Sequence, residues 1–132
     1  MINLPKFKLL GLTKCEVGAE WEYHSYYSYF SRLYYITSGG GFIEFLDENR
    51  VVELKPHHIY FVPAHCHFSL SARGKQHEEY NIEFLAAMDD GIEPFSYYNY
   101  LYEIPAEEGD LALFERLFQL NPEFRMLHGA SK

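Results

Sequence analysis

The sequence has few of the features that assign a protein to a class at once. Two cysteines, Cys15 and Cys66, occur in 132 residues without a Cys-x-x-Cys pair, so we expect free buried thiols and no disulfide framework. No apolar run approaches the length of a membrane span, and no charged N-terminal segment precedes an apolar one. These absences predict a soluble protein located in the cytoplasm.

Positive charge is also scarce. The chain has 11 Lys and Arg against 19 Asp and Glu, and its formal net charge is −8. Such a chain lacks the basic surface that binds the phosphate backbone, so this segment alone is not expected to bind DNA or RNA. It also has no Gly-x-Ser-x-Gly motif, no phosphate-binding glycine loop and no catalytic carboxylate pair at a recognisable spacing. We therefore predict a protein that is not an enzyme and has no cofactor.

Aromatic residues are abundant, with 12 Tyr and 11 Phe against one Trp. Such side chains favour pleated, half-buried surfaces and ligand pockets. The length fits one domain with a short appendage. Short β-branched and aromatic segments separated by turn residues predict strands at residues 32–37, 42–46, 51–54, 59–62, 66–70 and 79–85.

The segments around these strands give weaker signals. Gly39, Gly40 and Gly41 predict a tight hairpin between two of the strands. Residues 1–31 show no regular period, and residues 25–30 fit either an edge strand or a loop over a pocket. Residues 95–102 are rich in tyrosine and could form one more strand.

The pattern changes to helical spacing after Glu107. The residues that share one side of this helix are Leu111, Phe114, Leu117 and Phe118. Pro122 restricts the residue before it, so the helix should end near Leu120. Such a face more often packs against the core than against a partner.

The stretch from Leu54 to Phe68 resembles the second motif of the cupin barrels, with Pro63 in the matching position. Phe68 stands where these proteins usually have a metal-binding His. Counting back from Gly39, Arg32 falls on the Glu position of the first motif. None of the four metal-ligand positions then carries its expected residue, and neither Arg nor Phe can coordinate a metal.

The order and spacing of the strands resemble the sensor domain of AraC-type transcription regulators. The matching segments are residues 32–41, a first core strand with its glycine turn; residues 56–63, where His57 and His58 replace the usual Gly-Asp; and residues 80–84, a closing strand. The resemblance implies an all-β, cupin-like double-stranded β-helix (jelly-roll) barrel at residues 1–105, followed by a C-terminal α-helical segment at 106–132. It implies a metal-free barrel that binds a small effector, often a sugar, and a homodimer. In that family a separate helix-turn-helix domain binds DNA, and these 132 residues show no counterpart of it.

Arg32 is the leading candidate for a ligand contact. By strand alternation it shares a face with Tyr34, Ile36 and Ser38, which the cupin register would turn into the barrel. Its five donors suit a carboxylate, a phosphate or sugar hydroxyls. The alternative is a salt bridge to Glu83 or Glu79, or an exposed strand end.

The strand at residues 79–85 carries polar residues on one face, which is either the inner or the solvated face. Trp21 either covers a pocket or packs over the barrel. The residues predicted to bind ligand are Arg32, Tyr34, Ser38, Phe68, Asn81, Glu83 and Trp21. The residues predicted to form a dimer interface are Leu111, Phe114, Leu117 and Phe118.

Two competing functions remain open on the sequence. His65 and His67 share one strand face, and with His24 or Glu83 they could hold the metal of a cupin isomerase or dioxygenase. Phe68 in the barrel position would instead turn both histidines outward. The other alternative is a stand-alone sugar-binding module with no link to DNA. The sequence does not name the effector, the target promoter or the direction of regulation.

Overall fold

The computed structural model describes residues 5–92 and 101–123, and this part of the chain contains nine strands and one helix. The elements are β1 (Lys6–Val17), β2 (Glu22–Tyr27), β3 (Ser31–Gly39), β4 (Gly41–Phe45), β5 (Arg50–Leu54), β6 (His58–Val62), β7 (His67–Ser71), β8 (His77–Ala87), β9 (Glu103–Pro105) and α1 (Asp110–Leu120). The predicted class, mostly β with one C-terminal helix, is confirmed.

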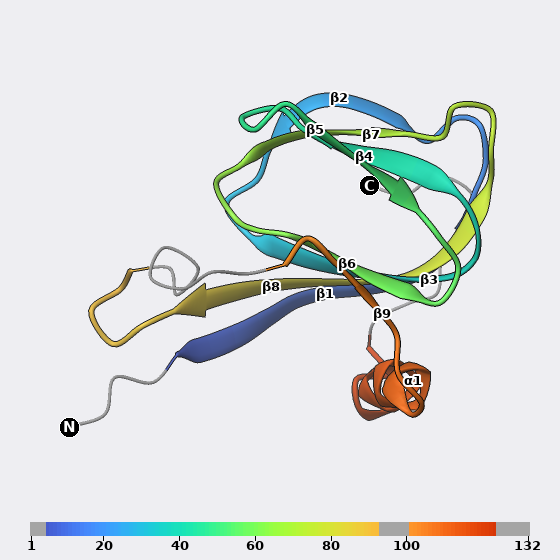
Figure 1. Cartoon of the computed structure of the whole chain (residues 1–132). Coiled ribbons are helices and arrows are strands. Elements are labelled where there is room, and N and C mark those ends of the chain that lie inside the picture. Colours follow the sequence, from blue (N-terminus) through green and yellow to red (C-terminus); the bar gives the residue numbers. More distant parts are fainter. Residues whose placement is uncertain (1–4, 93–100, 124–132) are drawn as a thin grey trace.

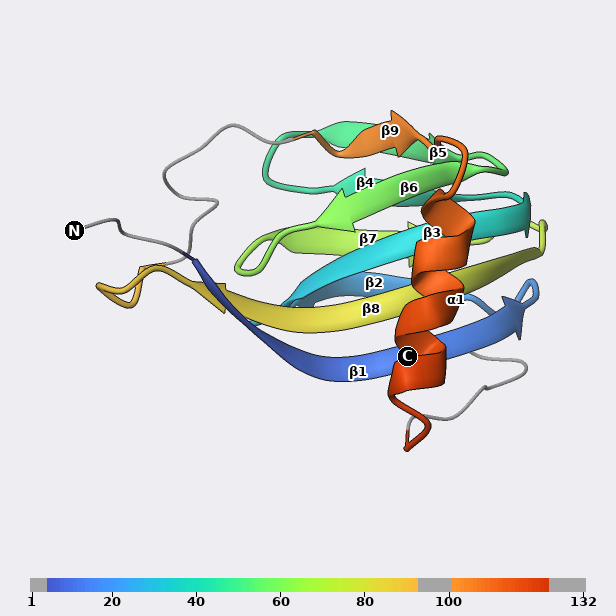
Figure 2. The ribbon, with the colours of Figure 1, turned by 90° about the horizontal axis from the view of Figure 1, so that it is seen from below.

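The strands form two antiparallel sheets that lie face to face (Figure 1). One sheet has five strands in the order β1-β8-β3-β6-β9, and the other has four in the order β2-β7-β4-β5. The helix α1 lies on the outer face of the five-stranded sheet and crosses β3 and β8, as the second view shows (Figure 2). Each sheet therefore turns one face toward the space between the layers.

Six of the strands, β3 to β8, match the predicted strands to within two residues at each end, and β2 agrees with the edge-strand alternative for residues 25–27. The lack of regular structure predicted for the segment before β2 was wrong. Residues Lys6–Val17 form one long strand, β1, which pairs with β8 along its whole length. A bulge between Leu9 and Gly11 interrupts its pairing register and so its alternation of faces. The strand β9 was also not predicted, and residues 95–100 of the predicted tyrosine-rich strand lie outside the described residues.

The glycine turn does not form the expected hairpin. It carries the chain from β3 in one sheet to β4 in the other, because β3 pairs with β6 and β8 whereas β4 pairs with β5 and β7. Gly39 has φ of 87°, and a Cβ there would lie 2.0 Å from the carbonyl oxygen of Gln76. A Cβ on Gly41 would lie 3.2 Å from the Trp21 ring. The glycines thus allow a close passage between the two layers.

The helix is held by aromatic side chains. Phe114 is buried, with its ring edge-on to Tyr35 at 5.3 Å, and Phe118 packs edge-on to Tyr80 at 5.1 Å. Both tyrosines belong to the outer face of the five-stranded sheet. The last helical residue is Leu120, as the position of Pro122 predicts.

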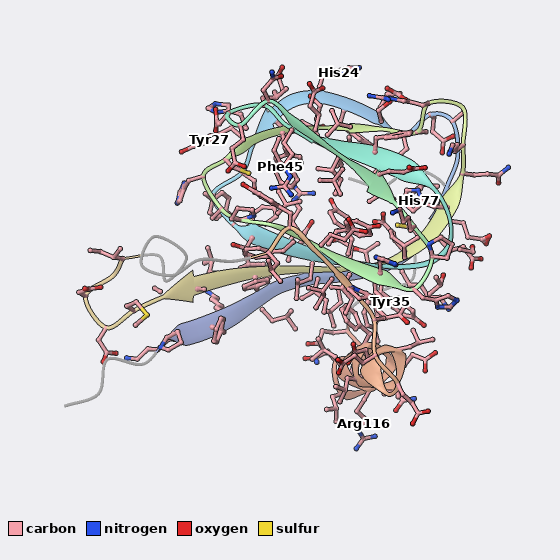
Figure 3. All side chains as sticks on the ribbon, in the orientation of Figure 1. His24, Tyr27, Tyr35, Phe45, His77 and Arg116 are labelled. Atoms are coloured by element: carbon pink, nitrogen blue, oxygen red, sulfur yellow. The ribbon has the colours of Figure 1, made fainter. Side chains whose placement is uncertain are left out.

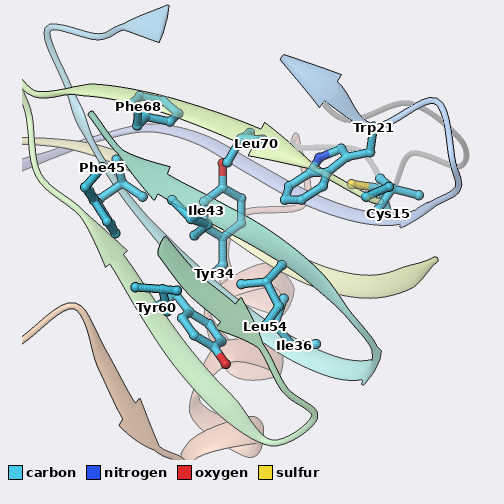
Figure 4. Close-up of a cluster of buried hydrophobic side chains, with 14 residues drawn as sticks. Cys15, Trp21, Tyr34, Ile36, Ile43, Phe45, Leu54, Tyr60, Phe68 and Leu70 are labelled. Carbon is cyan, nitrogen blue, oxygen red and sulfur yellow. The ribbon is translucent and has the colours of Figure 1, made fainter. Parts of the chain in front are cut away.

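The main core lies between the sheets (Figure 4). Its largest fully buried side chains include Trp21, Tyr34, Tyr60 and Phe68, each exposed by 1% or less. Burying a side chain of this size stabilises a fold by about 1.5–3 kcal/mol. The interior is therefore both the centre of stability and the place where polar side chains are most conspicuous.

Candidate functional site

The four-stranded sheet gives the interior an apolar roof. Its inward side chains are Ile43, Phe45, Val52, Leu54, Phe68 and Leu70. None of these six carries a hydrogen-bonding group, although Tyr23 on β2 also packs against the core and brings a hydroxyl. Most of the polar groups inside the molecule therefore come from the opposite sheet.

The opposite sheet provides a polar floor along β8. Tyr80 contacts the helix on the outer face, and His77 contacts Trp21 in the interior, so alternation turns the odd-numbered residues of β8 inward. The inward residues are His77, Glu79, Asn81 and Glu83. The sequence left open whether the polar face of this strand is the inner or the solvated one, and the structure shows that it is the inner one.

Arg32 lies on β3 beside this polar row, in register with Glu83. Its side chain is 9% exposed, and its Nη1 donates to Tyr34 Oη at 3.4 Å and lies 3.9 Å from Glu83 Oε2. The guanidinium also lies over the rings of Phe30 and Phe68, at 4.8 and 5.5 Å from their centres. Arg32 is therefore a buried cation with aromatic neighbours on the interior side.

Electrostatics keep this cation charged. Burial by itself would lower the pKa of Arg32, but the Tyr34 hydroxyl and the Glu83 carboxylate outweigh it and raise the pKa above its ordinary value. Burial raises the pKa of Tyr34 well above its usual range, so its hydroxyl stays protonated. Arg32 and Tyr34 together present a positive charge and a hydroxyl group to the interior.

Asn81 is the next member of the polar row and is 2% exposed. Its Nδ2 donates to Glu83 Oε2 at 3.5 Å, so Arg32 and Asn81 both approach the same carboxylate oxygen. Its Oδ1 is buried and has no hydrogen-bond partner among residues 5–92 and 101–123. Buried carbonyl oxygens are rarely left in this state.

The far end of the row forms a second polar group. His77 Nε2 lies 2.7 Å from Glu79 Oε1, and both side chains are 0% exposed. The thiol of Cys15 donates to the other Glu79 oxygen at 3.7 Å, and the Trp21 ring stands edge-on to His77 at 4.6 Å. Figure 3 shows His77 at one end of the space between the sheets. The floor therefore carries polar groups along its whole length.

The structure brings together most of the predicted ligand-binding residues. Arg32, Tyr34, Phe68, Asn81 and Glu83 converge at one end of the interior. Trp21 lies at the other end and is fully buried, so it packs inside the molecule and does not cover a pocket from outside.

Ser38 was predicted to continue the face of Arg32, and this was wrong. A bulge between Ile36 and Ser38 shifts the register of β3 against β8. Ser38 is exposed and donates to Glu78 Oε1 at 3.3 Å, on the outer face. The structure thus removes Ser38 from the group around Arg32.

Sequence reasoning did not predict the histidine–carboxylate pair at the far end. It began the strand at Glu79, two residues after His77, and considered Glu79 only as a salt-bridge partner of Arg32, although the alternation of Asn81 and Glu83 extends back to both positions. Phe30 was also missed, because it precedes β3 and contacts Arg32 only through the folded chain.

The histidines of the competing metal site point away from the interior. His65 and His67 are exposed and contact Tyr27 and Asp47 on the outside, whereas Phe68 is fully buried. Glu83 lies inside, so it cannot join them at one ion. Among the residues that the structure describes, no group of three or more potential metal ligands occurs.

The predicted dimer residues lie on the helix that covers the five-stranded sheet. Leu111, Phe114 and Phe118 pack against the outer aromatic cluster of their own chain. Leu117 is half-buried, and the large hydrophobic residues that α1 leaves exposed are Leu113 and Leu120, at 69% and 61%. The dimer interface stays a prediction.

A surface pocket of about 350 Å³ lies where β1 and β3 end and β8 begins. Its polar lining includes Glu16, Ser38, Gln76 and Glu78. It is separate from the group around Arg32.

In the described part of the chain no helix is long and apolar enough to cross a membrane.

No family model matches the sequence, and no curated relative matches it. The fold is similar to that of ToxT from Vibrio cholerae. A structure of ToxT from strain SCE256 with a bound unsaturated fatty acid gives a TM-score of 0.50 at 8% identity, covering 90% of this chain and 48% of that one. ToxT from V. cholerae O395 gives 0.49 at 15%, covering 90% and 47%. The chain thus spans about half the length of these proteins, and the likeness is one of fold.

Proposed function

We propose that this chain is the effector-binding and dimerisation part of an AraC-type transcription regulator, with a small molecule bound between the sheets of a cupin-like, jelly-roll barrel. The fold likeness supports it, since ToxT is an AraC-family regulator and one of its structures holds an unsaturated fatty acid. The order of strands and turns from β3 to β8 supports it independently of that likeness.

One observation carries the proposal: the interior has a buried cation and a polar floor beneath an apolar roof. A core that served stability alone would not need Arg32, Asn81 and Glu83, because burying polar groups costs free energy unless they are satisfied. Recognition of a small molecule needs such a combination, in which apolar walls exclude water and a few polar groups fix the orientation.

The proposed effector is a small molecule with polar groups, a sugar among the candidates. Aromatic faces such as that of Phe68 stack on sugar rings, and guanidinium donors bind hydroxyls and carboxylates. The site is proposed to work without a metal, because Arg32 and Phe68 occupy positions where cupins keep ligands and neither can coordinate an ion. The same residues support the proposal that the effector is bound without chemical change.

The proposed mechanism is a shift between two populated conformations. A ligand in the interior would favour one position of α1. The helix packs on the outer face of the five-stranded sheet, and the inner face of the same sheet forms the polar floor. Residues 1–105 would sense the effector and residues 106–132 would form the homodimer. DNA would be bound by a helix-turn-helix domain beyond these residues, and the test is whether the natural reading frame continues past Lys132 into a basic helical segment.

Ligand binding is tested by thermal shift with a panel of sugars and short carboxylic acids, on the wild-type chain, Arg32→Met and Arg116→Met. Arg116 lies on the outer side of α1 and controls for the loss of one positive charge (Figure 3). A compound that stabilises the wild-type chain and Arg116→Met, and fails to stabilise folded Arg32→Met, supports the site. Equal stabilisation of all three proteins would place the ligand elsewhere, and no stabilisation by any compound would contradict a sensor role.

A further inference from the structure

The amide of Asn81 lies in the interior with its nitrogen hydrogen-bonded and its oxygen unsatisfied by residues 5–92 and 101–123. Its nitrogen donates to Glu83, while its oxygen is buried without a partner in the described residues. Leaving such an oxygen unsatisfied means that its loss of water is not compensated by a hydrogen bond in the protein. With only 2% of Asn81 exposed, a group that binds this oxygen must itself enter the interior.

Glu83 marks the position of an anionic group between two donors. Its Oε2 lies 3.9 Å from Arg32 Nη1 and 3.5 Å from Asn81 Nδ2. Both distances are long for charge-assisted hydrogen bonds, which are usually 2.7–2.9 Å. The Glu83 side chain is 20% exposed against 9% for Arg32, so it is the member of the pair that reaches solvent. A carboxylate from a ligand could replace it at the same two donors.

A carboxamide presents a donor and an acceptor side by side. A fragment that matches it has an acceptor and a donor on adjacent carbon atoms, as the carboxylate oxygen and the hydroxyl of a 2-hydroxy acid do. The carboxylate would bind Arg32 and Asn81 Nδ2, and the hydroxyl would donate to Asn81 Oδ1. A simple fatty acid would leave that oxygen unsatisfied, and a neutral sugar would leave Arg32 without a new counter-charge.

The remainder of the ligand meets apolar surface. Phe68 lies beside Arg32 in the roof, and the side chains beyond it in that sheet are hydrocarbon. We therefore propose that the interior site takes a 2-hydroxy acid with a hydrocarbon tail, its head group held by Arg32 and Asn81 in the place of the Glu83 carboxylate. This inference rests on the proposed function, since it names the ligand class of that site.

The experiment compares 2-hydroxyoctanoate with octanoate by isothermal titration calorimetry. The wild-type chain should bind the hydroxy acid at least about tenfold more tightly, which is the effect of one hydrogen bond that satisfies a buried oxygen. In Asn81→Leu, which is similar in shape and has no amide, the ratio of the two affinities should fall to near one. In Glu83→Gln both acids should bind more tightly with the ratio kept, because a competing charge is removed.

Each contrary outcome has a separate meaning. Equal affinities in the wild-type chain that are lost in Arg32→Met would overturn the hydroxy-acid assignment and leave the sensor function in place. Failure of both acids to bind would also overturn it, and the wider panel would then decide the proposed function on its own. Should Asn81→Leu not fold, the wild-type ratio and Glu83→Gln still decide the outcome.

Discussion

Replacing Phe114 by Ala tests how firmly α1 belongs to the folded unit. The ring is 9% exposed and contacts Tyr35 at 5.3 Å and Tyr80 at 6.4 Å between ring centres. Truncating a buried Phe to Ala typically costs about 3–5 kcal/mol, and we expect about 3 kcal/mol because the ring lies at the edge of the molecule. With an unfolding entropy of about 2.1 cal/mol/K per residue, that loss should lower Tm by about 10 °C.

The matched control is Leu113→Ala, one position earlier on the same helix. Leu113 is 69% exposed, so its truncation should change stability by less than about 0.5 kcal/mol. Urea unfolding should be followed by far-ultraviolet circular dichroism and by the fluorescence of Trp21, which reports on the interior. We expect both transitions of Phe114→Ala to move together. Equal effects of the two substitutions, or a fluorescence transition that does not move, would show that the helix is not part of the cooperative unit.

Three further predictions follow from the interior and the turns. Replacing Glu79 by Leu removes the partner of a fully buried histidine and should cost about 2–4 kcal/mol in urea unfolding, whereas an unchanged midpoint would show that the contact contributes nothing. Gly39→Ala should lower the free energy of unfolding by more than about 2 kcal/mol, because its Cβ would meet the backbone at 2.0 Å. The control is Gly74→Ala, which is also at positive φ but has open space around it and should lose about 1 kcal/mol. Similar losses of stability in the two variants would contradict the close passage of the chain at Gly39. Burial raises the pKa of Cys66 to about 11, so the thiol is protonated below that pH and the thiolate fraction rises tenfold per pH unit up to it. Alkylation by iodoacetamide, followed by mass spectrometry, should therefore accelerate without a plateau from pH 8 to 10, and a plateau near pH 9 would refute the shift.

The strands that sequence patterns predicted are those whose pairing is regular. β3 to β8 combine β-branched and aromatic residues with turn residues at both ends, so local preference and tertiary structure agree. β1 was missed because a bulge next to Gly11 breaks its alternation, and alternation is the signal that sequence analysis uses. The glycine turn was assigned to a hairpin because the sequence does not show which sheet the following strand joins.

The candidate site was predictable in part for the same reason. Alternation places Arg32 and Tyr34 on one face and Asn81 and Glu83 on another, but only the three-dimensional structure shows that both faces point inward. A polar row on a strand normally indicates solvent, and here it lines the core. Ser38 left the group because one inserted residue in β3 reverses the side on which later residues lie.

The arrangement of β8 joins two distant surfaces through a single peptide unit. Asn81 faces the interior, and its neighbour Tyr80 supports the aromatic rings of α1 on the other side. A strand is stiff along its length and shares its backbone between both sides, so a sideways movement forced on one residue is imposed on the next. A small tilt of this strand would move the helix without any rearrangement of loops. The five-stranded sheet would then transmit a movement in the interior directly to the helix.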